Sequence, residues 1–378
     1  MIAIGLPIVL LGAAYAGGQR YLRGAAFVVQ AAGMQGAART VAEWQSEATI
    51  ESSLTVPWRG GSLPARRYLP ARFHGRVFLL VPGVHASGVE EPRLMGFARD
   101  LASMGHAVVT IGPPDLARYT ISAATTDAIE DAAVWLSGQH DLAPDGHIGM
   151  MGISFAGGLS IVAAGRPRLH DSVVAVLSLG GHGDLQRTLK YLCTGIEPDG
   201  THRPPHDYGV VIILLGVAEK VVPADQVQAL RATLLTYLEA SRLDLIDKAK
   251  SWNTFQEVKA LTATLPEPSR TIMGYVNDRD VGRLGPLLLP HLGAMADNPA
   301  LSPAASPPPS AEVYLLHGSG DNVIPAAESL LLARDLQQRH ATVHVLATPL
   351  ITHAEVEHVS DVGEIWRLIA FWSRVLAE

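Results

Sequence analysis

The segment at residues 150–160, MMGISFAGGLS, places a serine between small residues at the end of an apolar run. Ser154 lies in the pattern G-x-S-x-A, with Gly152 two positions before it and Ala156 two positions after it. A serine held on a sharp turn from a strand to a helix exposes its hydroxyl for attack on a carbonyl carbon. Because so short a pattern also arises by chance, its meaning depends on the residues around it.

A serine hydroxyl needs a base to remove its proton, and the base needs an acid to orient it. Asp321, in LLHGSGDNVIP, and His353, in HVLATPLITHAEV, each follow an apolar run of β type by a few residues. Asp184 is a second candidate for the acid, and His358 is a second candidate for the base. Asp321 has a structural alternative, which is to cap the helix expected to follow it. The sequence therefore predicts a nucleophile, acid and base in the order Ser154, Asp321, His353.

Short β-rich runs alternate with helical stretches such as residues 92–104 and 125–138. Residues 54–70 precede them and read as a hairpin around two adjacent glycines. The runs are residues 76–83, 106–113, 147–154, 172–181, 311–318 and 341–348. Strands that are apolar along their whole length are buried on both faces. The pattern predicts an α/β fold with a mostly parallel central sheet and helices on both faces.

Ligands of an open parallel sheet bind outside the carboxyl ends of its strands. Ser154, Asp321 and His353 each follow one of the predicted strands, so we expect them at one edge of the sheet. Other polar residues that follow strands are candidates for lining a pocket there, although such residues also serve as structural hydrogen-bonding groups. These residues are His85, Ser87, Tyr119 and His182.

The alternation is interrupted once, by a long segment that reads as helices and ends in the proline-rich NPALSPAASPPPS. The helices either form a lid over an apolar pocket or pack on the core, and the proline-rich end predicts a stiff exposed connector. We expect an apolar amino-terminal segment and linker helix at residues 1–46, a core formed by residues 47–183 and 311–378, and an inserted helical cap at residues 184–310.

The amino-terminal residues 1–16 are apolar, and the first charged side chains are Arg20 and Arg23. At ~1.5 Å per residue this run reaches ~24 Å, short of a ~30 Å hydrocarbon layer. Three interpretations are open: a membrane anchor, a secretory signal that ends at residues 14–16, or a helix packed on the domain. The two arginines favour a membrane-associated protein with its catalytic domain on the cytoplasmic side. The alternatives are a secreted or periplasmic protein after cleavage and a soluble cytoplasmic protein.

Composition argues against several other classes of protein. The net charge of -7 and the lack of a Lys/Arg block argue against binding of nucleic acid. The single cysteine, Cys193, excludes an intramolecular disulfide and a multi-cysteine zinc site. His202 and His206 flank two prolines that prevent the helix such a ligand pair would need, so we predict no metal site.

From about residue 54 to its end, with the insertion set aside, the chain resembles α/β-hydrolase fold proteins of the esterase and dienelactone-hydrolase-like kind. The resemblance maps the nucleophile to Ser154, the acid to Asp321 and the histidine to His353. It also implies an oxyanion hole formed by the backbone N–H groups of Phe155 and, by position, Val84. The chain departs from the dienelactone hydrolases proper, whose nucleophile is cysteine, and it lacks the HGGG run of one esterase branch.

The expected function is therefore that of a serine hydrolase that cleaves carboxylic esters through a Ser-His-Asp triad and an acyl-enzyme intermediate. This chemistry needs no cofactor, and its partner is a small, hydrophobic ester. An acyltransferase or a peptidase with the same triad is an alternative, as is a non-catalytic binding protein of the same fold. A membrane association through residues 1–16 would be compatible with each of these.

Overall fold

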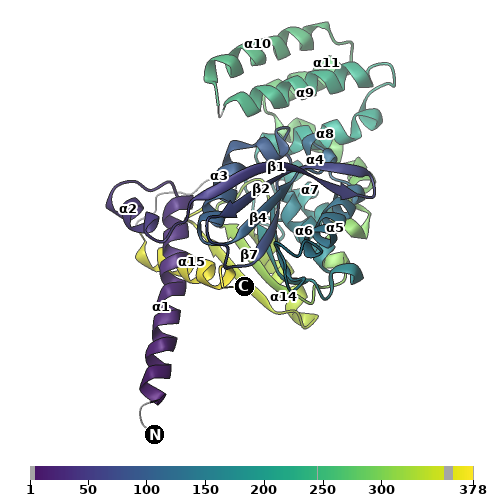
Figure 1. Ribbon diagram of the computed structural model, residues 1–378. Helices are drawn as coiled ribbons and strands as arrows, with labels where there is room; N and C mark the ends of the chain where they lie inside the picture. The colour runs from purple at the N-terminus through teal and green to yellow at the C-terminus, as the bar shows by residue number, and fades with distance from the viewer. Residues whose placement is uncertain (1–4, 245, 353–360, 378) are drawn as a thin grey trace.

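The computed structural model of the chain describes residues 5–244, 246–352 and 361–377 (Figure 1). Within them, eight strands form one sheet in the order β1-β2-β4-β3-β5-β6-β7-β8. The strands are β1 (Thr49–Trp58), β2 (Gly61–Pro70), β3 (Val77–Val81), β4 (Ala107–Ile111), β5 (Ile148–Ile153), β6 (Val173–Leu179), β7 (Glu312–Gly318) and β8 (Val343–Thr348). Strand β2 is antiparallel to both of its neighbours, and all the other pairs are parallel.

Each strand predicted from an apolar run is present, and the hairpin of β1 and β2 closes where Trp58 pairs with Gly61. The central strands β3 and β4 are buried at every residue, as expected for strands covered on both faces. Along β3, Val77 and Leu79 face one hydrophobic layer, whereas Phe78 faces the other. This alternation gives the sheet two separate cores.

One face of the sheet carries α5 (Ala123–Ser137), α6 (Phe155–Ala164) and α14 (Ala326–Gln338), and the other carries α3 (Pro92–Ser103) and α15 (Val362–Val375). The strand order, with β2 alone reversed and helices on both faces, is that of the α/β-hydrolase fold. The fold class predicted from the sequence is therefore confirmed. Strands β3, β5, β6, β7 and β8 end at a common edge, which is where parallel sheets bind ligands.

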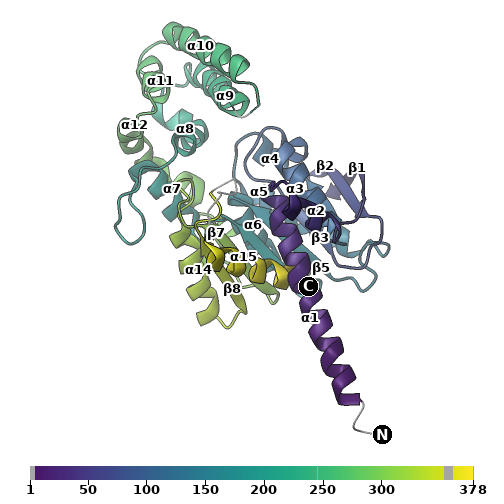
Figure 2. The same cartoon turned by 90° about the vertical axis from the view of Figure 1, so that its left-hand side faces the viewer.

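The amino-terminal region is a continuous helix, α1 (Gly5–Ala31), followed by the short α2 (Ala37–Glu43). The predicted linker helix is therefore not one helix: its first part is the end of α1, and its last part is the separate α2. The second half of α1 packs on α15, where the ring centroids of Phe27 and Trp372 lie 4.4 Å apart. The beginning of α1 projects away from the sheet (Figures 1 and 2). In the described part of the chain, we find no helix with both the length and the apolarity needed to cross a bilayer.

Between β6 and β7 the chain forms a series of helices, of which α9–α11 lie away from the sheet in Figure 2. These helices are α7 (Leu185–Thr194), α8 (Asp207–Val221), α9 (Val227–Asp244), α10 (Lys248–Thr264), α11 (Ser269–Asn277), α12 (Val281–Leu288) and α13 (Gly293–Ala296). The helical character expected for this segment is confirmed.

The proline-rich segment after α13 is not the exposed connector that the sequence predicts. It folds into two single-turn 3₁₀ helices, η4 (Pro299–Leu301) and η5 (Pro303–Ala305), and Leu301 and Ser302 are buried. The carbonyl of Leu301 accepts a hydrogen bond of 2.7 Å from Nε2 of His182, and the Ser302 hydroxyl accepts one of 2.9 Å from the amide of Leu185. The prediction was wrong because donors of the core satisfy backbone and hydroxyl groups of this segment.

Candidate active site

Ser154 lies on the turn between β5 and α6, where its φ of 57° and ψ of −134° are unusual for a residue with a side chain. Two backbone hydrogen bonds hold this turn. The amide of Ser154 donates to the carbonyl of Leu179 at 2.7 Å, and the amide of Gly157 donates to the carbonyl of Ser154 at 2.8 Å. Because neighbouring structure fixes the strained backbone, the direction of the serine side chain is fixed as well.

The small residues around Ser154 allow β5 and α6 to approach at backbone contact. A Cβ atom on Gly152 would lie 2.2 Å from the carbonyl oxygen of Ala156, and one on Gly157 would lie 2.3 Å from Oγ of Ser178. Side chains at these two positions would push α6 away from β5 and from Ser178 of β6. Ala156, where the motif more often has glycine, is accommodated as a fully buried residue.

The loop after β3 lies beside the serine. A Cβ atom on Gly83 would be 3.3 Å from Cβ of Ser154 and 4.0 Å from its Oγ, so this loop and the turn are in contact. Val84 follows Gly83 and lines the same cavity as Ser154 and Phe155. Phe155 is the first residue of α6, so its amide N–H has no acceptor within the helix. The residues expected to bind an oxyanion are thus close to the serine.

Asp321 lies in the turn after β7 and is only 2% exposed. Its Oδ1 accepts hydrogen bonds from the amides of Val323 and Ile324 at 2.8 and 3.0 Å, and its Oδ2 lies 3.4 Å from Nε2 of His317. Helix α14 begins after Pro325 without a side-chain cap. Asp321 is therefore not the cap of this helix, which was the structural alternative for it. The two amides fix the orientation of the carboxylate.

The second candidate for the acid, Asp184, has a structural task. It is the N-cap of α7, where its Oδ1 accepts a hydrogen bond of 2.8 Å from the amide of Arg187. Its own amide donates to Oε2 of Glu328 at 3.0 Å. It is not among the described residues that line the cavity at Ser154. These contacts favour Asp321 over Asp184 as the acid.

The two candidates for the base, His353 and His358, lie outside the described residues. Thr352, which directly precedes them in the described chain, lines the same cavity as Ser154.

The cavity next to Ser154 has a volume of about 930 Å³. The insertion contributes Tyr208, Arg242 and Phe255 to its lining, and residues of α1, α3 and α15 line it as well. Its size is that of pockets that enclose most of a small organic ligand.

Of the residues expected to line the pocket, His85 does so, and its Nδ1 accepts a hydrogen bond of 3.2 Å from the amide of Ser87. Burial lowers the pKa of the His85 imidazole, so it is neutral at pH 7. Ser87, Tyr119 and His182 are not among the described lining residues. Tyr119 packs edge-to-face on Tyr208, and His182 holds the segment after α13, so both stabilise the surrounding structure.

The residues that sequence reasoning missed come from helices without a chemical motif. Phe27, Val28 and Ala31 of α1 line the cavity, although the sequence suggested only a linker helix there. The sequence offered one indication of their role: Phe27 and Ala31 are four positions apart, which places them on one face of a helix. Which element that face would meet depends on the packing of α1 against α15.

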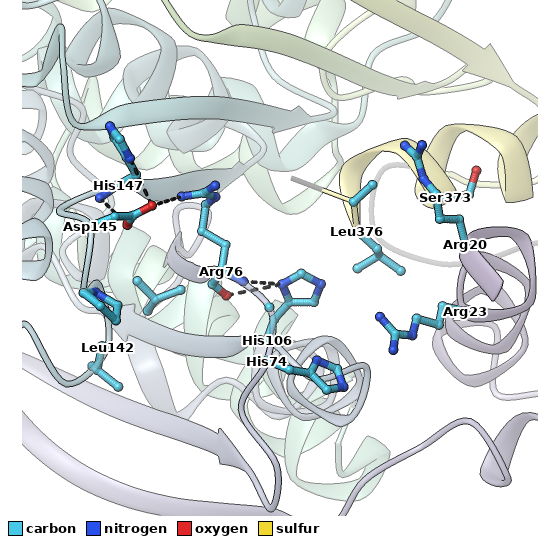
Figure 3. A pocket seen from close by; sticks show the side chains of 14 residues that line it. Arg20, Arg23, His74, Arg76, His106, Leu142, Asp145, His147, Ser373 and Leu376 are labelled. Carbon is cyan, nitrogen blue, oxygen red and sulfur yellow. Dashed lines mark hydrogen bonds and ion pairs between the residues drawn. The ribbon is translucent and has the colours of Figure 1, made fainter. Parts of the chain in front are cut away.

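A second cavity, of about 710 Å³, lies at the opposite edge of the sheet, before β3, β4 and β5 (Figure 3). Arg20 and Arg23 of α1 face Arg76 and His106 across it. Burial lowers the pKa of His106 to about 4, and Nδ1 of this imidazole accepts a hydrogen bond of 3.2 Å from the amide of Arg76. In the described ranges, no group of three metal-ligating side chains occurs at either edge.

No family model matches the chain, and no curated protein matches its sequence. Similar solved structures include an esterase from Pyrobaculum calidifontis, with 16% identity and a TM-score of 0.48 over 88% of each chain. A thermostable carboxylesterase cloned from a metagenomic library has 15% identity and a TM-score of 0.48 over 95% of this chain and 96% of its own.

A thermostable esterase from Pseudomonas putida has 13% identity and a TM-score of 0.48 over 90% of this chain and 89% of its own. The fold is assigned from the strand order of this chain: it is an α/β-hydrolase fold with Ser154 on the turn that follows β5.

Proposed function

We propose that the protein is a serine hydrolase that cleaves carboxylic esters, with Ser154 as nucleophile, His353 as base and Asp321 as the orienting acid. The strained turn that holds Ser154 at the wall of a large cavity is the observation that carries this proposal. A serine without a catalytic task rarely needs such a backbone, because the strain costs about 1–3 kcal/mol.

In the proposed reaction, Oγ of Ser154 bonds to the ester carbonyl carbon while its proton passes to His353. The amides of Phe155 and Val84 donate hydrogen bonds to the oxyanion, and each such donor is worth about 3 kcal/mol of barrier. The alcohol leaves with the proton from His353, and the acyl group stays on Ser154. Water, deprotonated by the same histidine, then attacks the acyl carbon, and the carboxylic acid is released as His353 returns the proton to Oγ of Ser154. The steps need no cofactor.

We also propose that the helices between β6 and β7 act as a cap over the site. Tyr208 and Phe255 bring aromatic surface to the cavity, and Arg242 is paired with Glu239 at 2.6 Å. A cap of this kind would exclude water and select substrates by shape. Its aromatic surface favours uncharged, hydrophobic esters over charged ones.

The test is hydrolysis of p-nitrophenyl esters by the wild-type protein, by Ser154→Ala and by Ser87→Ala. Ser87 is the matched control, because it lies in a nearby loop and is not among the described residues lining the cavity. We expect activity in the wild type and in Ser87→Ala, and none above background in Ser154→Ala. Equal rates in the wild type and Ser154→Ala would refute the proposal. Added alcohols or amines would identify an acyltransferase if they captured most of the acyl group.

A further inference from the structure

The cavity at Ser154 continues past the site to the amino-terminal helix α1. Its lining includes Val28 and Ala31 of α1 and the next residue, Ala32, together with Ser154 and Phe155 at the site itself. The apolar helix at the start of the chain is therefore one wall of the cavity that contains the proposed nucleophile. A substrate bound at Ser154 could therefore extend along this cavity to α1.

The end of the cavity near α1 is bounded by aromatic rings from three helices. Phe27 of α1 lies 5.7 Å from Phe97 of α3 and 4.4 Å from Trp372 of α15, measured between ring centroids. Phe97 and Trp372 lie 6.0 Å apart, and all three residues line the cavity. Leu94 and Leu368 add aliphatic surface from α3 and α15. Such a lining attracts hydrocarbon.

At this end of the cavity the charged lining residues are Glu91, Arg93 and Asp100, whereas the other charged lining residues belong to the insertion. Glu91 accepts a hydrogen bond of 2.7 Å from Nε of Arg93, so these two charges are paired. Asp100 also lines the cavity, and burial raises the pKa of its carboxyl. A sugar or peptide would need many more hydrogen-bonding partners along its length than this end of the cavity offers.

Small side chains on α1 keep the space open. Ala31, Ala32 and Gly33 follow one another at the end of the helix and its exit, and all three line the cavity. A large side chain at any of them would extend into space that is now open. At about 930 Å³, the cavity is much larger than an acetyl or butyryl ester requires.

We infer that the part of this cavity between Ser154 and α1 is a channel for a long aliphatic chain, so that the substrates are esters with a long unbranched alkyl or acyl chain. This inference rests on the proposed function, and it assigns α1 a role in substrate selection. Each methylene that enters the channel raises kcat/KM by about fourfold, the equivalent of ~0.8 kcal/mol.

The test compares Ala31→Trp with Met34→Trp. Met34 is the matched control, because it is an exposed residue just beyond α1 and does not line the cavity. kcat/KM is measured for p-nitrophenyl esters of acids with two to twelve carbons and for acetates of alcohols of the same lengths. In one of the two series, the kcat/KM of Ala31→Trp is at least thirtyfold below that of the wild type for the twelve-carbon substrate. For the two-carbon substrate it is less than twofold below. Met34→Trp keeps the wild-type profile.

An equal loss at every chain length in Ala31→Trp, or no loss in either series, overturns the channel. Val28→Trp serves as a second variant if Ala31→Trp does not fold. A binding measurement separates the channel from the proposed chemistry: calorimetric titration of Ser154→Ala with methyl dodecanoate and methyl butyrate. If Ser154→Ala binds the dodecanoate more tightly than the butyrate, and adding Ala31→Trp removes this preference, the channel is supported even if the wild type cleaves no ester. No preference for the longer ester contradicts it.

Discussion

The two ends of strand β3 lead into cavities with opposite chemistry. At its carboxyl end, Gly83 contacts Ser154, and the cavity of about 930 Å³ is lined mainly by apolar and aromatic side chains. At its amino end, Gly75 contacts His106, and the cavity of about 710 Å³ is lined by arginines and histidines. One end holds a strained serine, whereas the other holds a buried neutral imidazole and a paired acid.

The difference follows from the direction of the strands. Loops at the carboxyl ends connect strands to the amino termini of helices, where backbone N–H groups are free to bind a substrate. Loops at the amino ends need only close the structure, and some of the charged side chains there pair with one another. Asp145, for example, lies 3.1 Å from Nδ1 of His147 and 3.6 Å from Arg76. We therefore expect changes at the carboxyl edge to alter activity and changes at the amino edge to alter stability.

The largest effect is expected for the acid at the carboxyl edge. Asp321→Asn should lower kcat for ester hydrolysis by about 10⁴-fold, because an amide can no longer orient and stabilise the charged histidine. Asp184→Asn is the matched control, since asparagine is as good an N-cap as aspartate and α7 keeps its cap. A similar loss of kcat in both variants, measured at saturating ester, would show that Asp321 has no special role.

At the amino edge, His106 should make stability depend on pH. Burial, the main cause, lowers the pKa of His106 to about 4 from its usual 6.5, so between these values the unfolded chain binds a proton that the folded chain does not. The free energy of unfolding therefore rises with pH from 4 to 6.5, by up to about 3 kcal/mol from this residue.

His106→Asn should remove this part of the slope, and urea unfolding at pH 4.5, 5.5 and 6.5 measures it. His85 and His182 also have lowered pKa values, so a smaller slope remains in the variant. An unchanged slope in His106→Asn would contradict the assignment.

The two glycines at the ends of β3 give a direct comparison. A Cβ on Gly83 would be 3.3 Å from Cβ of Ser154, so Gly83→Ala should shift the serine by a few tenths of an ångström and lower kcat/KM by about tenfold. A Cβ on Gly75 would be 2.6 Å from Nδ1 of His106, so Gly75→Ala should cost about 1–3 kcal/mol of stability and leave kcat/KM unchanged. Ester kinetics and thermal unfolding of both variants measure these two effects. A loss of kcat/KM in Gly75→Ala with no loss in Gly83→Ala would contradict the difference between the two edges.

The smallest effect is expected for Arg23, which is half-buried at the amino edge. In the part of the chain that the structure describes, Arg23 forms no ion pair, so Arg23→Ala should change the free energy of unfolding by no more than about 0.5 kcal/mol. Ester hydrolysis should be unaffected. A large loss of activity in this variant would show that the two edges are coupled.

The positions of the strands along the chain were predictable, because the sequence of each strand encodes it locally. The run that became β3 is apolar at each of its five residues, which is the pattern of a strand covered on both faces. The glycines of the β1–β2 hairpin likewise marked a turn. Ser154 was predictable as a turn residue because the small residues at positions 152 and 156 are required where strand and helix touch.

Features that depend on distant contacts were not predictable. The prolines after α13 suggested an exposed connector, but the partners of this segment, such as His182 and Leu185, lie more than one hundred residues away along the chain. Similarly, nothing local in α1 shows that Phe27 meets Trp372 and bounds the cavity at Ser154. Both are results of tertiary packing, which composition and periodicity do not encode.

The most direct test of the account is covalent labelling with a fluorophosphonate, which reacts only with a serine whose hydroxyl is activated. We expect the intact mass of the wild-type protein to increase by a single adduct, located on the peptide that contains Ser154, and the mass of Ser154→Ala to stay unchanged. A wild-type protein that stays unlabelled, or an adduct that forms equally in Ser154→Ala, would contradict the assignment of Ser154 as the nucleophile.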